Sequence, residues 1–559
     1  MSIPVPDTVV ATAATPILDV RDLQISYAGP SDRTTVVHGV SFSVNPGEVV
    51  ALVGESGSGK TSTAQAVIGL LADNGRVEAG SIRINGEEIS HWNAKRLRNI
   101  RGTVVSLVPQ DPGNSLNPVL TIGEQVREML SIHGRISRRE ADKRVIELLT
   151  QVGLSDPALR ARQYPHELSG GMKQRVLIAI AVALRPALII ADEPTSALDV
   201  TVQKRILDLI DDLRREYGTA LLLVTHDLGV AADRSDRIVV LQGGRIQEQG
   251  VTKEVLSAPR SAYTRKLLSD APALSSVPAR SPMTTQQPAI VTVTDLIQTF
   301  GLSGNRNFRA VDGVSFSVAR GTTHAIVGES GSGKTTTIRT IAGFQKPSGG
   351  DVQIAGIDIA NLRSEALRQL RRKVQLVYQN PWASLDPRQT IRAIVEEPLL
   401  NFDKIPRDER DIRVRAIIEK VGLPADVLSR FPHALSGGQR QRVAIARALI
   451  LEPEVVILDE AVSALDVTVQ AQILNLLAEL QRDLGLTYIF VSHDLAVVRQ
   501  IADTVSVLHN GKQVDYGPVE NVFSNPSSAY TRELIEAIPG KALHLTAASR
   551  QTAAAGLHS

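Results

Sequence analysis

The stretch GESGSGKT at Gly54–Thr61 decides the fold, because it follows a short apolar run at 48–53 and opens a segment with helical spacing. Its glycines let the backbone curl so that N–H groups point inward at an anion, and a helix N-terminus adds positive potential. The same eight letters recur at Gly328–Thr335, 274 residues later (328 − 54). From average composition, one chance match in a chain of this length has a probability of about two per cent. The sequence therefore predicts two phosphate-binding loops.

Each residue type in these loops has a chemical purpose. The lysine suits the β- and γ-phosphates of a nucleotide, and the threonine hydroxyl suits Mg²⁺. The first loop's predicted binding residues are Gly54, Ser56, Gly57, Gly59, Lys60 and Thr61, and those of the second are Gly328, Ser330, Gly331, Gly333, Lys334 and Thr335.

Composition excludes several kinds of site and partner. The 559 residues carry a formal net charge of +2, which gives no reason to expect a nucleic-acid partner. There are no cysteines, so disulfides, Cys-bound zinc and iron–sulfur clusters are excluded. No apolar run reaches the 18 or so residues of a membrane span, and the start lacks the features of a secretory signal. We expect a cytoplasmic chain whose membrane spans, if its process needs them, come from other chains.

The chain is a tandem repeat. VHGVSFSV at 37–44 matches VDGVSFSV at 311–318, and LSGG occurs at 168–171 and 435–438. The pattern predicts a first domain at 1–270 and a second at 290–540. A Pro/Ser/Ala-rich linker at 271–289 joins them, and a poorly ordered tail follows at 541–559.

Short continuous apolar runs recur in each copy, at 48–53, 187–191 and 220–224 in the first and at 454–458 and 488–491 in the second. Such runs suit strands that are buried on both faces of a mostly parallel sheet. The predicted fold is therefore α/β, with two domains.

Paired carboxylates end one of these strands in each copy. Asp192 and Glu193 follow the run at 187–191, and Asp459 and Glu460 follow the run at 454–458. Alone, such a pair is more often a solvated turn. Beside a phosphate-binding loop, the aspartate suits Mg²⁺ and the glutamate suits an attacking water.

The LSGG stretches predict helix starts, with Ser169 and Ser436 as N-caps. The unusual feature is basic residues in the first turns, which oppose the helix dipole and are tolerable where the N-terminus meets an anion. These residues are Lys173, Arg175, Arg440 and Arg442.

Three further pairs occupy matched positions, and each has a structural alternative. His226 and His493 follow apolar strands, and lone histidines there are more often structural. Gln110 and Gln379 would be unremarkable surface glutamines alone. Tyr27 and Phe300 precede the loops and suit either the core or stacking on a base.

The ordered set of loop, glutamine, LSGG, carboxylate pair, SALD and histidine occurs twice, and it resembles the ATP-binding-cassette family. The resemblance implies two P-loop ATPase domains, each with a mostly parallel core sheet, an antiparallel β subdomain and a helical subdomain. It also implies ATP and Mg²⁺ as cofactors.

The resemblance implies a head-to-tail pairing of the two cassettes, with each ATP between the loop of one cassette and the LSGG helix of the other. It makes Glu193 and Glu460 general bases, makes the histidines γ-phosphate sensors, and assigns the glutamines to catalysis and to Mg²⁺. One composite site joins Lys60, Gln110, Asp192, Glu193 and His226 to Ser436, Gly437, Gly438 and Gln439; the other joins Lys334, Gln379, Asp459, Glu460 and His493 to Ser169, Gly170 and Gly171.

A narrower resemblance is to the peptide and nickel importer branch, through QDPGNSLNP, QNPWASLDP, YPHELSGG, FPHALSGG, SAYTRKLL and SAYTRELI. It implies an ATPase at the cytoplasmic face of the membrane, driving two permease subunits fed by an extracytoplasmic binding protein. Di- or oligopeptides are the expected cargo, with nickel, glutathione or another small solute as alternatives. The loops after Gln110 and Gln379 and the segments 121–153 and 390–422 are expected to form the permease docking groove.

Three departures from the family pattern stand out. Met172 replaces the glutamine found at Gln439, so the two ATP sites are expected to differ in rate. Ala461 replaces a proline without loss of a catalytic group. The iron–sulfur cysteines of some branch members are missing.

A cytosolic twin-cassette translation factor of the ABC-F type is the alternative of another class. Such proteins resemble this chain in having two cassettes, but they typically carry a long charged helical linker. The short, nearly uncharged linker at 271–289 and the small net charge favour the importer.

Overall fold

The computed structural model describes residues 15–29, 32–134, 136–196, 198–274, 287–302, 306–403, 405–463 and 465–540. The predicted tail at 541–559 and most of the predicted linker lie outside this part of the chain. Contacts divide the chain into two compact units. The first holds Gln203–Leu268 and the described residues up to Leu198, and the second holds Asp199–Val202 and those from Ser269 onward. The domain limits at 270 and 290 stay a prediction.

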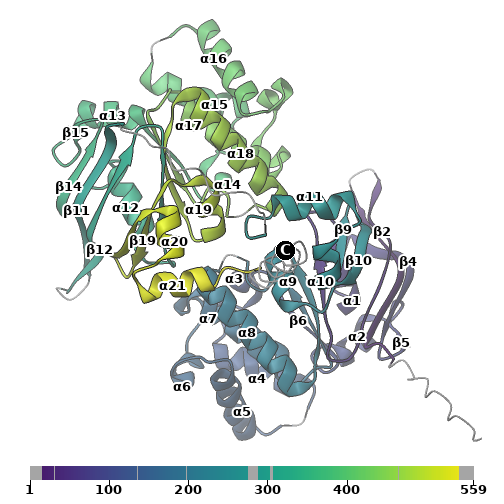
Figure 1. Ribbon diagram of the computed structural model, residues 1–559. Helices are drawn as coiled ribbons and strands as arrows, with labels where there is room; N and C mark the ends of the chain where they lie inside the picture. Colours follow the sequence, from purple (N-terminus) through teal and green to yellow (C-terminus); the bar gives the residue numbers. More distant parts are fainter. Residues whose placement is uncertain are drawn as a thin grey trace, which may run out of the picture. The chain divides into compact units, whose positions relative to one another are not determined.

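The centre of the first unit is a six-stranded sheet in the order β10-β9-β3-β8-β7-β6 (Figure 1). The apolar runs form its middle, because β3, β7 and β8 are buried along their whole length. They pair in parallel, and only β10 runs antiparallel to its neighbour. The strands are β3 (Val49–Val53), β6 (Val105–Val108), β7 (Leu188–Asp192), β8 (Ala220–Thr225), β9 (Arg237–Gln242) and β10 (Arg245–Val251).

A second, antiparallel sheet in the order β2-β1-β4-β5 shares a hydrophobic core with β3, β7 and α1. The described helices of the unit fall into those that flank the parallel sheet and a helical part inserted between β6 and β7. The sheet is formed by β1 (Leu18–Ala28), β2 (Arg33–Val44), β4 (Gly75–Ile84) and β5 (Glu87–Glu88). The helices are α1 (Lys60–Ile68), α2 (Ala94–Ile100), α3 (Pro112–Ser115), α4 (Ile122–Ile132), α5 (Arg138–Gln151), α6 (Pro157–Arg160), α7 (Gly170–Val182), α8 (Val200–Tyr217), α9 (Leu228–Arg234), α10 (Thr252–Ser257) and α11 (Ala262–Asp270).

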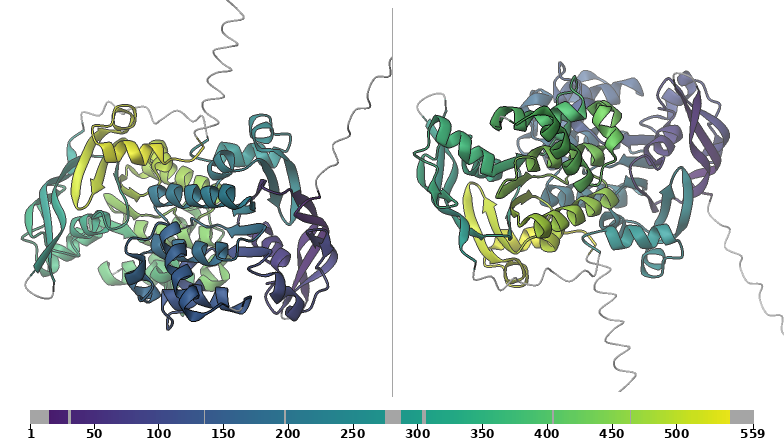
Figure 2. Two further views of the ribbon diagram at one scale, coloured as in Figure 1. Left: turned by 90° about the horizontal axis from the view of Figure 1, so that it is seen from below. Right: turned by 90° about the horizontal axis from the view of Figure 1, so that it is seen from above.

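The second unit repeats this architecture. Its six-stranded sheet has the order β16-β17-β18-β13-β19-β20, and its antiparallel sheet has the order β12-β11-β14-β15. In the views of Figures 1 and 2, the antiparallel sheet and the helical part of each unit lie on different sides of the parallel sheet. The strands are β11 (Ala289–Leu302), β12 (Arg306–Ala319), β13 (Thr323–Val327), β14 (Gly349–Ile354), β15 (Ile357–Asp358), β16 (Val374–Val377), β17 (Val455–Asp459), β18 (Thr487–Ser492), β19 (Thr504–His509) and β20 (Lys512–Pro518). The helices are α12 (Lys334–Ile341), α13 (Ser364–Lys373), α14 (Pro381–Ser384), α15 (Ile391–Phe402), α16 (Arg407–Lys420), α17 (Gly437–Leu449), α18 (Val467–Leu484), α19 (Leu495–Ile501), α20 (Val519–Ser524) and α21 (Ala529–Glu536).

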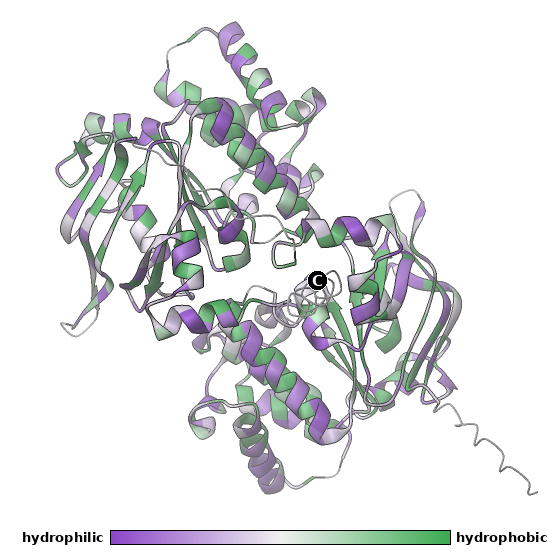
Figure 3. Cartoon of the chain, in the orientation of Figure 1, coloured by the Kyte–Doolittle hydropathy of each residue, from purple (hydrophilic) through white to green (hydrophobic). Residues whose placement is uncertain are grey.

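The predicted α/β class and twin architecture are confirmed. The central strands are hydrophobic throughout, whereas the helices mix hydrophobic and hydrophilic residues (Figure 3). None of the helices in the described ranges has the length and apolar character needed to cross a bilayer.

Candidate active site

Each phosphate-binding loop leaves the carboxyl end of a central strand and closes on the first turn of a helix. At Gly54 (φ 150°) an added Cβ would lie 2.1 Å from the carbonyl oxygen of Leu241. At Gly328 it would lie 2.2 Å from that of Leu508. Side chains cannot fit there, so both positions require glycine. Gly59 and Gly333, with φ 94° and 105°, then cap the helices that begin at the two lysines.

The lysine of each loop is held by the loop itself. Lys60 Nζ donates to the carbonyls of Gly54 at 2.7 Å and Glu55 at 2.8 Å. Lys334 donates to the equivalent carbonyls at 2.7 and 2.9 Å. Burial lowers the pKa of Lys334, although nearby carboxylates oppose this effect. Each ammonium is therefore buried within the loop that is predicted to hold the phosphates.

Two of the predicted Mg²⁺ residues, Thr61 and Asp192, meet beside the first loop. Thr61 Oγ1 donates to Asp192 Oδ1 at 3.3 Å. Burial, and then the charge of Glu193, raise the pKa of Asp192 to about 6. The same two causes, with Glu460 as the neighbour, raise that of Asp459 to about 6. Lys60 and Lys334 oppose these rises in pKa but do not cancel them, so a further cation would be favourable beside each carboxylate.

The donor set fits Mg²⁺. No cluster of three or more His, Cys, Asp or Glu suited to a metal occurs among the described residues. Mg²⁺ needs only one or two carboxylates when it keeps waters and phosphate oxygens. A hydroxyl, a carboxylate and a glutamine amide oxygen are hard oxygen ligands of the kind it prefers.

Glu193 lies at the meeting point of two other predicted residues. Its Oε2 accepts from Gln110 Nε2 at 2.8 Å, and its Oε1 lies 3.1 Å from Nδ1 of His226. Burial alone would raise the pKa of Glu193, but the hydrogen bond and charge of His226 hold it below its ordinary value. The pKa of His226 is raised in turn by Glu193, against the effect of burial.

The second copy repeats this triad. Gln379 donates to Glu460 at 2.7 Å, and His493 Nδ1 lies 3.4 Å from the same carboxylate. Both glutamates have left-handed backbone, with φ 45° at Glu193 and 47° at Glu460. Such strain in a non-glycine residue is typical of functional positions. The triad therefore comprises an ionised carboxylate, a donor amide and an imidazole, a set that can orient and deprotonate a water.

The LSGG residues begin α7 and α17 in the helical parts. Ser169 and Ser436 are exposed N-caps, as predicted from their type. In the second copy Gln439 closes a capping box, because its Oε1 accepts from Ser436 N at 3.1 Å. Met172 offers no such oxygen, so α7 has only the bond from Met172 N to Ser169 Oγ, at 3.4 Å. The two LSGG helices thus start differently.

The basic residues behind LSGG have a role that the sequence interpretation missed. Arg175 donates to the carbonyl of Val152 at 2.5 Å, and Arg442 to that of Val421 at 2.6 Å. Val152 and Val421 are the C-caps of α5 and α16, where a cation is favourable. The position of these two arginines near a helix N-terminus is therefore explained by their bonds to these C-caps, without a bound anion.

The predicted stacking aromatics have different surroundings. Tyr27 packs against the core of the first unit and donates to Ser62 Oγ at 3.1 Å. Phe300 is 37% exposed and lies opposite Phe308 in the β11–β12 pair. Base stacking stays a prediction for both.

A tyrosine contact at each loop was also missed. Tyr263 and Tyr530 contact the loops from the two SAYTR stretches. The repetition of SAYTR in both halves is the only sequence signal for these contacts.

The residues predicted for each copy, apart from its LSGG start and its aromatic, gather at the carboxyl edge of that copy's parallel sheet.

Comparisons with known proteins agree with this arrangement. The model of the ABC transporter family matches residues 37–196 and 311–463, which together exceed half of the chain. The model described as "Oligopeptide/dipeptide transporter, C-terminal region" matches 247–294 and 514–555.

The curated relatives also carry both halves. The chain is 42% identical to the glutathione import ATP-binding protein GsiA of Escherichia coli K12, over 94% of this chain and 89% of that protein. It is 42% identical to the peptidoglycan transport ATP-binding protein YejF of Agrobacterium fabrum, over 94% of this chain and 97% of that protein. A solved structure of cbiO1 from Clostridium perfringens, 32% identical, covers 43% of this chain and 92% of its own with a TM-score of 0.39. The family match and the full-length relatives lead to one conclusion: this chain belongs to the ABC transporter family, as an ATP-binding protein with two cassettes.

Proposed function

We propose that this chain is the ATP-hydrolysing component of an importer for short peptides. The observation that carries the proposal is the triad of amide, carboxylate and imidazole beside a lysine-bearing loop, built twice from the same three residue types. The cargo class is supported by the oligopeptide/dipeptide transporter region in both halves. It is also supported by a relative named for glutathione, which is itself a tripeptide.

In the proposed mechanism, loop N–H groups and the lysine bind the β- and γ-phosphates. Glu193 accepts a proton from the attacking water, and Gln110 orients that water. His226 keeps the carboxylate ionised and approaches the γ-phosphate. Thr61 and Asp192 would hold Mg²⁺, with Gln110 as a further ligand, and the bound ion would supply positive charge at the phosphate oxygens. The equivalent residues act in the second copy.

We further propose that each ATP lies between the loop of one cassette and the LSGG helix of the other. Ser169 and Ser436 are exposed at the N-termini of α7 and α17, helices of 13 residues each. An exposed N-terminus of that length favours an anion such as the γ-phosphate. ATP binding would then close the pair, and hydrolysis would reset it.

The membrane partners are proposed from a cavity in the second unit. It measures about 240 Å³ and lies where α15 and α17 meet β16. Its lining includes Phe344 and Tyr378, which are 47% and 42% exposed. Its lining also includes Ser384 and Leu385 of the loop after Gln379, and Pro398 of the segment 390–422, where the docking groove was expected. We propose that an apolar helix of a permease subunit binds here, with the cassettes at the cytoplasmic face of the membrane and a binding protein delivering cargo outside.

Uptake of labelled di- to hexapeptides tests the proposal, with labelled glutathione and nickel as parallel cargoes. Three strains of the source organism are compared: one with the chain deleted, one restored with wild type, and one restored with Lys60→Ala/Lys334→Ala. Peptide uptake should be lost on deletion and should return only with wild type. Equal peptide uptake in all three strains would remove the peptide assignment, and a deletion effect on nickel alone would replace it.

A further inference from the structure

In both units a tyrosine of the C-terminal region binds the start of the phosphate-binding loop. The hydroxyl of Tyr263 accepts from the backbone N–H of Glu55 at 3.2 Å. The hydroxyl of Tyr530 accepts from that of Glu329 at 3.0 Å. The two contacts are equivalent, since Glu55 and Glu329 each follow the first glycine of the loop. Two independent copies of the fold therefore build the same contact.

A carboxylate sets the position of the helix that carries this tyrosine. Glu248 of β10 accepts from the N–H groups of Arg260 at 2.8 Å and Ser261 at 3.0 Å, directly before α11. Burial opposes ionisation of Glu248, but these N–H groups hold its pKa below the ordinary value. The start of α11, and with it Tyr263, is therefore tied to the parallel sheet.

The second unit uses the same device. Asp515 of β20 accepts from the N–H groups of Ser527 at 3.2 Å and Ser528 at 3.0 Å, and from the hydroxyl of Thr531. The ring of Tyr530 also stacks on His509, with centroids 3.9 Å apart and planes 12° apart. Burial raises the pKa of Tyr530 to about 12, so its hydroxyl stays neutral at physiological pH.

The contact acts on the residue that supports the catalytic lysine. The N–H of Glu55 donates to Tyr263, while the carbonyl of Glu55 accepts from Lys60 Nζ at 2.8 Å. Glu55 also anchors the next stretch of the loop, because its carbonyl accepts from Ser58 N at 3.2 Å, whereas the space around Gly57 is open, with nothing within 4 Å of an added Cβ. Glycines carry a large conformational entropy. A fixed point at the loop's start limits that freedom.

We infer that Tyr263 and Tyr530 are positioning residues, which hold each phosphate-binding loop in the shape that accepts ATP. The inference rests on the proposed function, because it concerns binding at that same site. The tyrosines act through the loop backbone. Their loss should therefore weaken nucleotide binding more than it slows hydrolysis by the bound state.

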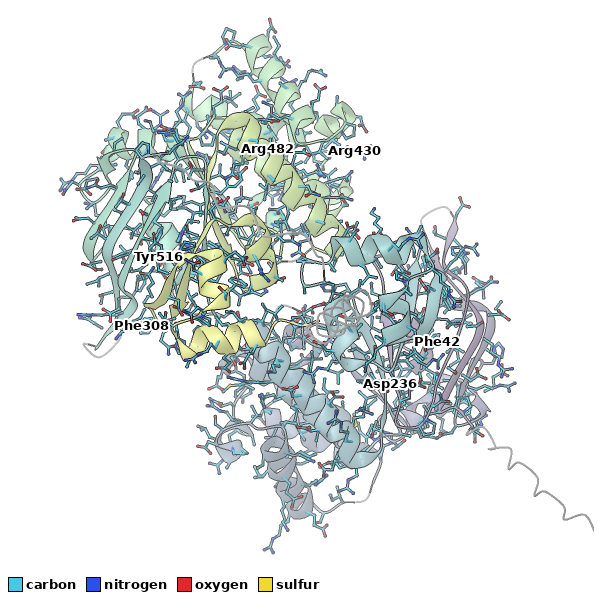
Figure 4. The ribbon with its side chains drawn as sticks, in the orientation of Figure 1. Phe42, Asp236, Phe308, Arg430, Arg482 and Tyr516 are labelled. Atoms are coloured by element: carbon cyan, nitrogen blue, oxygen red, sulfur yellow. The ribbon has the colours of Figure 1, made fainter. Side chains whose placement is uncertain are left out.

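The test uses the full chain and the double variant Tyr263→Phe/Tyr530→Phe, which keeps both rings and removes both hydroxyls. The matched control is Tyr516→Phe (Figure 4), whose hydroxyl accepts from the N–H of Ser317 at 3.4 Å, between β20 and β12. Calorimetry with Mg²⁺-AMP-PNP gives Kd, phosphate release gives kcat and KM for ATP, and thermal unfolding gives Tm.

The double variant should raise Kd and KM about fivefold, the factor for one hydrogen bond of ~1 kcal/mol. Its kcat should stay within about twofold of wild type, because bound phosphates order the loop themselves. The control should match wild type in Kd and KM.

Unchanged Kd and KM in the double variant would overturn the inference, whether or not Tm falls. A fall in kcat alone would also overturn it, since the tyrosines would then act on chemistry. If the wild-type chain itself fails to bind the nucleotide, the proposed function is lost, and the inference is lost with it. That result is distinguishable from normal nucleotide binding by the wild type, the double variant and the control, which would overturn the inference alone.

Discussion

Gln110 Nε2 donates to Oε2 of Glu193 at 2.8 Å, across 83 residues of sequence. The glutamine follows β6 and precedes α3, and the glutamate follows β7, so the bond joins the ends of two neighbouring strands. Gln379 and Glu460 repeat it at 2.7 Å. A loop that moves when a partner binds next to it would therefore change the environment of the proposed base. Under the proposed function, this bond is a direct link between a loop expected to contact the permease and the proposed base.

The two proposed sites should have unequal rates. Gln439 closes a capping box on α17 that Met172 does not close on α7. The single variants Glu193→Gln and Glu460→Gln should therefore lower the ATPase rate by different factors, measured as phosphate release at saturating ATP. Equal losses in the two variants would count against this asymmetry.

The capping difference can be tested separately. Gln439→Met should lower the stability of the second unit by about 0.5–1 kcal/mol, because the N–H of Ser436 loses its side-chain acceptor. The reverse change, Met172→Gln, should stabilise the first unit by a similar amount. Denaturant unfolding measures both, and an unchanged free energy of unfolding in Gln439→Met would show that the box contributes nothing.

In the protein without nucleotide, the ionised carboxylates of Asp192 and Asp459 should lower the free energy of unfolding. Their pKa values are raised to about 6, so the folded state binds their protons more tightly than the unfolded state does. The cost is thus complete above pH 6 and declines as the pH falls toward 4. Asp192→Asn/Asp459→Asn should raise the free energy of unfolding at pH 8 by up to about 3 kcal/mol per cassette, and by less at pH 5.

Thermal unfolding without Mg²⁺ or nucleotide measures this effect at the two pH values. The asparagine at 192 can still accept from Thr61 through its Oδ1, so the fold loses no hydrogen bond there. A lower Tm in the variant at pH 8 would mean that the carboxylates already have a compensating cation partner.

Gly54→Ala/Gly328→Ala should weaken ATP binding at least about tenfold. The new Cβ atoms would lie 2.1 and 2.2 Å from backbone carbonyl oxygens, so each loop must shift. Gly47→Ala/Gly321→Ala is the matched control, because these glycines have φ 69° and 77° with nothing within 4 Å. The control bears the strain of positive φ alone and should bind ATP normally. Equal loss in both variants would show that general destabilisation, rather than loop shape, controls binding.

The sequence predicts the central strands well, because continuous burial leaves a continuous apolar run. The runs at 187–191 and 454–458 correspond to β7 (Leu188–Asp192) and β17 (Val455–Asp459). The carboxylate pairs follow at once, so their place at the sheet edge could also be predicted. Their roles in catalysis stay a prediction.

Contacts that depend on distant packing could not be predicted. Arg175 shares no sequence pattern with Val152, although the structure joins them. Tyr263 and its hydrogen-bond partner Glu55 are separated by 208 residues in the sequence. Such pairs are set by how helices pack on the sheet, and no local periodicity records that packing.

The proposed docking groove should depend on its exposed aromatic rim. Phe344→Asp removes an exposed aromatic side chain from its rim and should lower peptide uptake at least about tenfold, because aromatic anchors supply much of the binding energy of an interface. The ATPase rate of the purified chain should stay within about twofold of wild type. Ile357→Asp, on the antiparallel strand β15, is the control and should leave uptake unchanged. Normal uptake with Phe344→Asp would place the permease elsewhere.

The most direct test of the account is phosphate release by Glu193→Gln/Glu460→Gln, measured beside binding of Mg²⁺-ATP. Glutamine matches the shape of each carboxylate but cannot take a proton from water, so hydrolysis should fall by about a hundredfold or more while ATP still binds. Glu147→Gln, at an exposed ion pair on α5, is the control and should hydrolyse normally. Near wild-type hydrolysis by the double variant would contradict the assignment of Glu193 and Glu460 as the bases.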